Sequence, residues 1–274
     1  MGDDLLQPLR DLRVYLRWLE RTGMTPPRAE SRTEADAPRR PATTPPPAGD
    51  RRRPPPAPPA PAPPPHTPPD NEAPMTYTPV PFPPDDPKGR ALLDMAAEVA
   101  ACRACPLGEK RTNTVFGVGS PDADLVFIGE APGANEDRTG MPFVGAAGNL
   151  LTQELGRNGI TRDEVFICNI VKCRPPNNRD PEAGEIAACT PFLHRQLDVL
   201  KPRLLCALGR LAAGHLLGAP IRIMKQHGTW ERYAGLPLFI CLHPAAVLHQ
   251  GGNRELFVRD IETLAKAYHA LGRG

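Results

Sequence analysis

The sequence predicts a three-layer α/β/α sandwich around a central four-stranded parallel sheet, preceded by a disordered proline-rich tail. Short runs that are apolar throughout alternate with helical patterns from residue 90 onward, which is typical of strands buried on both faces of a parallel sheet. Residues 26–87 contain 24 of the 37 prolines and almost no large apolar side chains. Such a segment cannot bury enough surface to offset its ordering entropy, so it is expected to stay disordered.

Three regions follow from this composition. Residues 1–25 include the segment 4–20, which places leucines on one helical face and arginines on the other. This pattern predicts an amphipathic helix that either packs on the folded domain or docks a protein partner. Residues 26–88 are expected to be a linker, and 89–274 a single domain with one core. We expect the protein to be a monomer.

The expected elements alternate along the folded part. Strands are expected over 124–129, 165–171 and 203–208, with a strand or hairpin over 229–241. Helices are expected over 90–101, 145–157, 182–200, 209–217 and 254–270. Ligands of open parallel sheets bind at the carboxyl ends of the strands. Three polar segments begin at such ends, namely 130–143, 169–180 and 243–249, and they are the candidate site.

Charge and motifs exclude several classes of protein. Lys and Arg number 33 against 31 Asp and Glu, a net charge of +2, so any nucleic-acid contact must come from a local patch. The first residues lack the apolar core of a signal peptide, and no apolar run is long enough to span a membrane. Neither a Walker A loop nor a G-x-S-x-G motif occurs. We therefore expect an intracellular protein that is neither an NTPase nor a serine hydrolase.

Four of the seven cysteines are spaced as ligands. Cys102 and Cys105 form a C-x2-C-P motif, and Cys173 and Cys189 are separated by fifteen residues. Four thiolates suit zinc or a [4Fe-4S] cluster. Zinc ribbons usually repeat the short C-x2-C spacing, so an iron–sulfur cluster is favoured. The other cysteines lie inside apolar strands and are expected to be small buried residues.

Four motifs in order resemble the family 4 (iron–sulfur) uracil-DNA glycosylases. They are GEAPGANED, PFVGAAGNLL, CNIVKCRPPNNRDPE with the later Cys189, and HPAA. The similarity covers about residues 90–268. It implies a DNA-repair enzyme that flips uracil out of single- or double-stranded DNA and hydrolyses its N-glycosidic bond, leaving an abasic site. It also implies a [4Fe-4S] cluster on the four cysteines and a cytoplasmic, nucleoid-associated protein.

The resemblance assigns roles around the base. Phe143 would stack on uracil, and Asn169 would read the edge of the base. His243 would donate to uracil O2 as negative charge develops there. Other glycosylase families carry an Asp directly before the Pro of the first motif, in the loop that holds the base, where this chain has Ala131. The task of orienting water would then pass to Glu130 or Glu136.

The resemblance also suggests contacts with DNA outside the base. Lys172, Arg174 and Arg179 would contact phosphates. Val247 or Leu248 would wedge into the minor groove. The region after His243 departs from the common pattern of the family, since Ala246 replaces a frequent aromatic residue.

Two other readings stay open on the residues alone. One is a protein that binds uracil-DNA without turnover or traps it covalently. Relatives that trap uracil carry a basic loop with a His after the second strand, whereas this chain reads CRPPNNRDPE there. The other is an electron-transfer or redox-sensing iron–sulfur protein, a reading that leaves Phe143, Asn169 and His243 without a task.

Overall fold

The computed structural model describes residues 82–249 and 253–272. The predicted helix over 4–20 and almost all of the proline-rich segment lie outside the described residues, so both stay predictions. In the described part of the chain, no helix combines the length and apolar character needed to span a membrane.

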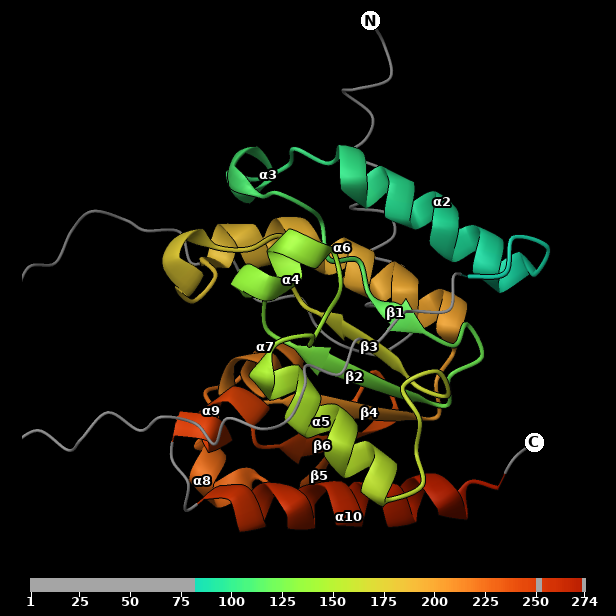
Figure 1. The fold of residues 1–274 in the computed structure, drawn as a ribbon, viewed down its shortest axis with the longest axis vertical. Coiled ribbons are helices and arrows are strands. Elements are labelled where there is room, and N and C mark those ends of the chain that lie inside the picture. Colours follow the sequence, from blue (N-terminus) through green and yellow to red (C-terminus); the bar gives the residue numbers. More distant parts are fainter. Residues whose placement is uncertain (1–81, 250–252, 273–274) are drawn as a thin grey trace, which may run out of the picture. The chain divides into compact units, whose positions relative to one another are not determined.

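A six-stranded sheet in the order β1-β3-β2-β4-β6-β5 forms the centre of the domain (Figure 1). The strands are β1 (Val118–Gly119), β2 (Leu125–Gly129), β3 (Phe166–Asn169), β4 (Leu204–Leu208), β5 (Thr229–Tyr233) and β6 (Leu236–Cys241). The four inner strands are mutually parallel, as predicted. β1 and β5 add an antiparallel strand at each edge, so the predicted count of four strands was two short.

The two added strands carry weak sequence signals. β1 has only two residues, and β5 reads TWERY with four exposed side chains. Neither has the continuous apolar run by which the inner strands are recognised. β5 and β6 form a hairpin through Ala234 and Gly235, both with positive φ, which confirms the hairpin alternative for 229–241.

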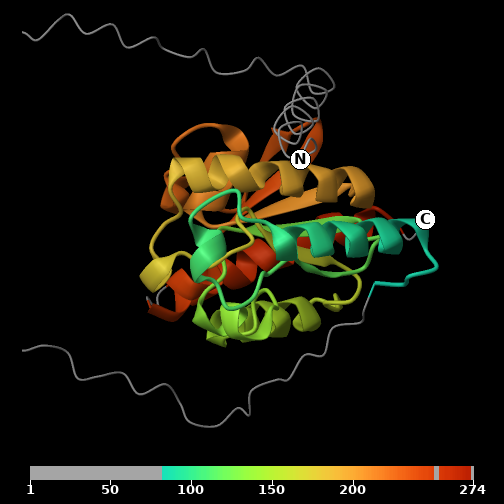
Figure 2. The same cartoon turned by 90° about the horizontal axis from the view of Figure 1, so that it is seen from above.

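Helices cover both faces of the sheet. The longer ones are α2 (Pro87–Ala101), α5 (Ala146–Arg157), α6 (Ala183–Leu200), α7 (Arg210–Leu217) and α10 (Arg254–Ala270). α2 and α6 lie side by side on one face, as Figure 1 and Figure 2 show. Alternate residues of β2 enter two separate cores: Val126 packs with α2 and α6, and Phe127 with α5 and α10. This alternation confirms the three-layer prediction.

Short helices replace several expected loops. They are α3 (Leu107–Lys110), α4 (Ala134–Thr139), the 3-10 turn η1 (Pro176–Asn178), α8 (Ile223–Gln226) and α9 (Pro244–His249). Three to six residues make too few turns for hydrophobic periodicity to show. α4 and α9 follow the ends of β2 and β6, so helices border the candidate site where loops were expected.

The domain begins before residue 89, the expected start. The Phe82 ring lies 6.2 Å from Phe116 and 6.0 Å from Phe166, measured between ring centroids. Asp86 accepts the Gly89 N–H at 2.6 Å and so caps α2. Pro87 at the first helical position costs no hydrogen bond, because that N–H would have no partner within the helix. The last residues of the predicted linker therefore belong to the folded domain.

Candidate active site and cysteine cluster

The carboxyl ends of the parallel strands bring the candidate side chains to one edge of the sheet. Glu130 directly follows β2, Asn169 ends β3, and His243 follows β6 by two residues. Phe143 reaches the same edge from the turn between α4 and α5, and its ring centroid lies 5.7 Å from that of His243. Phe143 and His243, a hundred positions apart in the sequence, thus become neighbours.

The Asn169 amide and the Phe143 ring both lie close to Gly129. A Cβ at Gly129 would overlap Asn169 Oδ1 and would lie 2.7 Å from Phe143 Cζ. Asn169 is only 2% exposed, and its Oδ1 accepts no hydrogen bond from the described residues. A buried amide oxygen without a donor costs free energy, so such an atom commonly awaits a ligand. The amide edge and the aromatic face together suit a flat, hydrogen-bonding ring.

Phe143 is held in a strained backbone conformation by a buried arginine. Its φ of 53° lies in the left-handed region, which costs a non-glycine residue free energy. Arg162, 4% exposed, donates from Nη1 to Phe143 O at 3.0 Å and from Nη2 to Pro142 O at 2.8 Å. The sequence analysis missed Arg162, because nothing local distinguishes it from a surface arginine.

Glu136 supports the same turn from the other side. Its Oε1 accepts the N–H groups of Val144 at 3.0 Å and Gly145 at 3.2 Å. These bonds occupy one oxygen of a carboxylate that was a candidate for orienting water. In this structure Glu136 therefore positions the turn that carries Phe143.

His243 is arranged as a neutral hydrogen-bond donor. Its Nδ1 accepts the Ala245 N–H at 3.1 Å, which leaves the ring proton on Nε2. Burial lowers the pKa of His243 to about 4, against an opposing effect of the Glu136 carboxylate. Gly209 has φ +92°, and a Cβ there would lie 2.8 Å from His243 Cβ. The absence of a side chain at Gly209 thus makes room for the imidazole.

Glu130 has a different electrostatic environment. Burial, together with the nearby charge of Asp180, raises the pKa of Glu130 to about 7, and the Arg210 guanidinium acts in the opposite direction. Arg210 Nη2 lies 3.4 Å from Asp180 Oδ2, which places this ion pair beside the carboxyl. A carboxyl with a pKa near neutrality can exchange a proton under ordinary conditions. Ala131, the next residue, is partly buried against the core on the α2 and α6 side.

The four predicted ligand cysteines line one small cavity. Cys102 and Cys105 come from the turn between α2 and α3, Cys173 follows β3, and Cys189 lies in α6. Burial raises the pKa of Cys173, and it raises the pKa of Cys189 to about 12. Buried thiols of this kind become thiolates only beside a positive charge such as a metal. The other three cysteines are fully buried in strands, as expected.

Hydrogen-bond donors surround the sulfur atoms. The Lys172 N–H lies 3.2 Å from Cys189 Sγ, and Arg111 Nη1 lies 3.1 Å from Cys173 Sγ. Such donors orient and stabilise thiolate ligands. Within residues 82–249 and 253–272, no three His, Cys, Asp or Glu side chains form a compact set for a single metal ion. The sulfur-lined cavity and its hydrogen-bond donors fit a group bound by thiolates, the donor set of an iron–sulfur cluster.

Two predicted DNA contacts are wrong. The Lys172 side chain is fully buried, and its Nζ donates to Asn169 O at 2.7 Å and to Gln196 Oε1 at 2.5 Å. Lys172 thus supports the backbone of Asn169 and cannot reach a phosphate. Val247 is 3% exposed because it packs in the core with α5 and α10, so it cannot be a wedge. Leu248 is 47% exposed and stays a candidate.

The remaining predicted phosphate contacts already have protein partners. Arg179 forms two hydrogen bonds with the Glu185 carboxylate, at 2.9 and 2.7 Å. Arg174 Nε donates to Asn178 Oδ1 at 2.7 Å. Both side chains therefore shape the loop after β3, and their contact with DNA stays a prediction.

Comparison with known proteins agrees with this architecture. The Uracil DNA glycosylase superfamily matches residues 116–265. A type-4 uracil-DNA glycosylase of Sulfurisphaera tokodaii is 43% identical over 183 residues, 64% of this chain and 83% of the relative. The type-4 uracil-DNA glycosylase of Pyrobaculum aerophilum is 45% identical over 168 residues, which are 58% of this chain and 86% of the relative. The type-4 uracil-DNA glycosylase of Thermotoga maritima is 44% identical over 179 residues, which are 62% of this chain and 92% of the relative. The chain belongs to the uracil-DNA glycosylase superfamily and, within it, to the type-4 group.

Proposed function

We propose that this protein is a monofunctional uracil-DNA glycosylase that removes uracil from DNA by hydrolysis and leaves an abasic site. The observation that carries the proposal is the buried Asn169 Oδ1, which accepts no hydrogen bond from any described residue and lies close to the ring of Phe143. A base inside a duplex cannot reach this edge of the sheet, so the nucleotide must be flipped out.

The Asn169 amide suits uracil and not cytosine. Its Oδ1 can accept from uracil N3–H while Nδ2 donates to O4. Cytosine presents an acceptor at N3 and an amino group at C4, the reverse pattern. Binding cytosine would leave buried polar groups unpaired, and such mismatches are rejected strongly. The Lys172 contact with Asn169 O helps to fix this reading edge.

His243 acts on the leaving base, and Glu130 acts on the attacking water. As the glycosidic bond breaks, its electron pair moves onto uracil, and the neutral His243 Nε2–H donates to O2, where charge builds. A water oxygen bonds to C1′ of the sugar, and Glu130 accepts the proton that this water loses. Glu136 holds the turn that carries Phe143 instead of handling the water.

We further propose that Cys102, Cys105, Cys173 and Cys189 hold a [4Fe-4S] cluster. When bound, the cluster would act as a covalent tie between segments distant in sequence. The cavity lined by the four thiols and the N–H donors to sulfur support this assignment. Beyond the cluster, exposed Leu248 is the remaining candidate for a groove wedge.

A uracil-release assay tests the function directly. Single-stranded, U·G and U·A oligonucleotides should each be tested for release of free uracil and for strand cleavage only after alkali. Asn169→Ala should lower the single-turnover rate by about 10²–10³, because two hydrogen bonds to the base are lost. A denaturant-stable protein–DNA adduct without free uracil would instead show covalent trapping. Tight binding of uracil-DNA without release or adduct would show a binding protein.

A further inference from the structure

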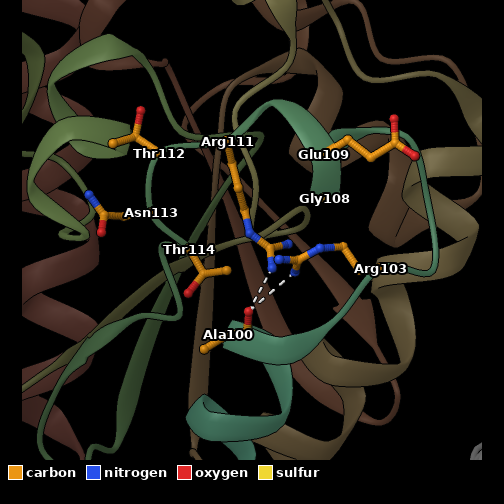
Figure 3. Close-up of a pocket in the computed structure, with 8 residues that line it drawn as sticks. All are labelled: Ala100, Arg103, Gly108, Glu109, Arg111, Thr112, Asn113 and Thr114. Carbon is orange, nitrogen blue, oxygen red and sulfur yellow. Dashed lines mark hydrogen bonds between the residues drawn. The ribbon is translucent and has the colours of Figure 1, made fainter.

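A polar pocket of about 310 Å³ lies next to the cysteine cluster and outside the uracil site (Figure 3). The end of α2, α3 and the segment 111–114 form its walls. Arg103, Glu109 and Arg111 supply its charged side chains. Nothing in the proposed reaction uses this pocket.

Two guanidinium groups converge in this pocket. Arg111 Nη2 donates to Ala100 O at 2.7 Å and to Cys102 O at 2.9 Å. Arg103 Nη1 donates to the same two oxygens, at 3.5 and 2.9 Å. Figure 3 shows the two side chains meeting at Ala100 O. Two positive charges held this close repel each other, and an anion between them would relieve that repulsion.

No carboxylate neutralises these arginines among the residues that the structure describes. Arg179 and Arg195 each have such a partner, in Glu185 and Glu98. Glu109 shares the pocket wall, but Figure 3 shows its carboxylate pointing away from both guanidiniums. The Nε atoms of Arg103 and Arg111 donate to none of the described residues, so donors remain for an anion.

The pocket is joined to the edge of the sheet that carries the uracil site. The N–H groups of Thr112 and Asn113 donate to Asp137 Oδ1 at 2.9 and 3.3 Å. Asp137 lies in α4 directly after Glu136, the residue that supports the turn with Phe143. Figure 1 shows α3 and α4 on the same side of the sheet. The bonds through Asp137 and α4 therefore link the wall of the pocket to the turn that carries Phe143.

We infer that the Arg103–Arg111 pocket binds a backbone phosphate of the DNA strand that carries the uracil. The inference rests on the proposed glycosylase function. Guanidinium forks match phosphate oxygens, and phosphate contacts position a protein on DNA without reading sequence. Because the net charge of the chain is only +2, affinity for DNA depends on such local sites.

Arg103→Gln tests the site, because no hydrogen bond joins Arg103 to a cysteine sulfur, whereas Arg111 also donates to Cys173 Sγ. Arg232→Gln is the matched control: its guanidinium donates to a backbone carbonyl, Gly235 O at 3.0 Å, in the hairpin at the other end of β6. Affinity for a duplex with a non-hydrolysable 2′-fluoro-deoxyuridine is measured over a range of salt concentrations. Iron content is measured in parallel.

Arg103→Gln should weaken duplex binding about three- to tenfold and lower the slope of log K against log salt by about 1. The single-turnover rate at saturating enzyme and the iron content should not change. Arg232→Gln should match the wild type. An unchanged salt slope for Arg103→Gln would overturn the inference.

Two further outcomes separate the sources of phosphate and the two proposals. If inorganic phosphate binds the wild type and not Arg103→Gln, while both bind DNA alike, the pocket takes a free anion and the DNA assignment is wrong. If the wild type releases no uracil but the salt slopes still differ, the phosphate site stands and the glycosylase proposal falls.

Discussion

At the scale of single residues, the same edge of the sheet shifts the pKa values of two side chains in opposite directions. His243 and Glu130 both follow parallel strands, and burial is the leading cause of each pKa shift. Burial disfavours the charged form, so it lowers the pKa of the imidazole and raises that of the carboxyl. Both groups are therefore pushed toward their neutral forms, which suits a hydrogen-bond donor and a group able to exchange a proton near neutral pH.

His243→Ala should separate chemistry from binding. If Nε2–H stabilises charge that develops only as the bond breaks, the single-turnover rate should fall by about 10²–10³. Affinity for uracil-DNA should change little, because the bound base carries no such charge. Phe143→Ala is the comparison, and it should weaken binding by about 1–3 kcal/mol through lost stacking. Normal cleavage at saturation with weak binding would make His243 a docking residue.

The pH dependence of the single-turnover rate should report Glu130. A general base acts only when ionised, and burial raises the pKa of Glu130 to about 7. The single-turnover rate of the wild type should therefore rise with pH through about 7. The pH–rate profile of Glu130→Gln should lack this rise. His243 has its pKa lowered to about 4, so it stays neutral across this range and contributes no second limb. A pH-independent rate between 5 and 9 in the wild type would contradict the role of Glu130.

At the scale of elements, the turn between α4 and α5 is a rigid support for one aromatic ring. Arg162 bonds the carbonyls of Pro142 and Phe143, while Glu136 bonds the N–H groups after them. A Cβ at Gly148 would overlap Phe143 O, so the first turn of α5 also packs directly against this backbone. These contacts together stabilise a positive φ that Phe143 would not adopt alone.

Arg162→Met should weaken uracil-DNA binding about tenfold, in the manner of Phe143→Ala, because the ring loses its fixed orientation. The two changes combined should cost little more than Phe143→Ala alone, since both act through the same ring. Arg162→Lys should restore part of the affinity. Arg259→Met, on the exposed surface of α10, is the control. Additive losses of affinity in the double variant would show that Arg162 affects binding by a route other than the Phe143 ring.

At the scale of the whole domain, the four candidate ligand cysteines come from three separate segments and line one cavity. Cys102 and Cys105 precede α3, Cys173 follows β3, and Cys189 lies in α6. Arg195 and Glu98 join α2 to α6 through an ion pair at 2.6 Å, so the same two helices have a second connection. A bound cluster would add to this connection, because binding energy at a site made by folding stabilises the fold.

Each of Cys102, Cys105, Cys173 and Cys189 changed to Ser should lose iron and lower the melting temperature. The purified wild type should be yellow-brown, with broad absorbance near 400 nm expected for an iron–sulfur protein. Cys168→Ser and Cys206→Ser are matched controls within strands, and both should keep the iron content of the wild type. Zinc without iron in the wild type would overturn the cluster assignment.

The sequence by itself determined the layers, the four parallel strands and the candidate residues at their ends. An unbroken apolar run such as that of β2 predicts a strand buried on both faces, because a strand of that composition cannot stay exposed to water. Motif order likewise sufficed to single out Phe143, Asn169 and His243. These signals are local in the chain, so they survive without knowledge of the fold.

Only the tertiary structure decided what the charged residues do. Lys172 reads as a surface cation, yet its ammonium is buried against Asn169 and Gln196. Arg162 likewise became a support of Phe143 only through chain segments far from it. Burial and hydrogen-bond partners are set by contacts between distant segments, and the role of a charge depends on both. The roles of Lys172 and Arg162 therefore could not be predicted from their sequence neighbours.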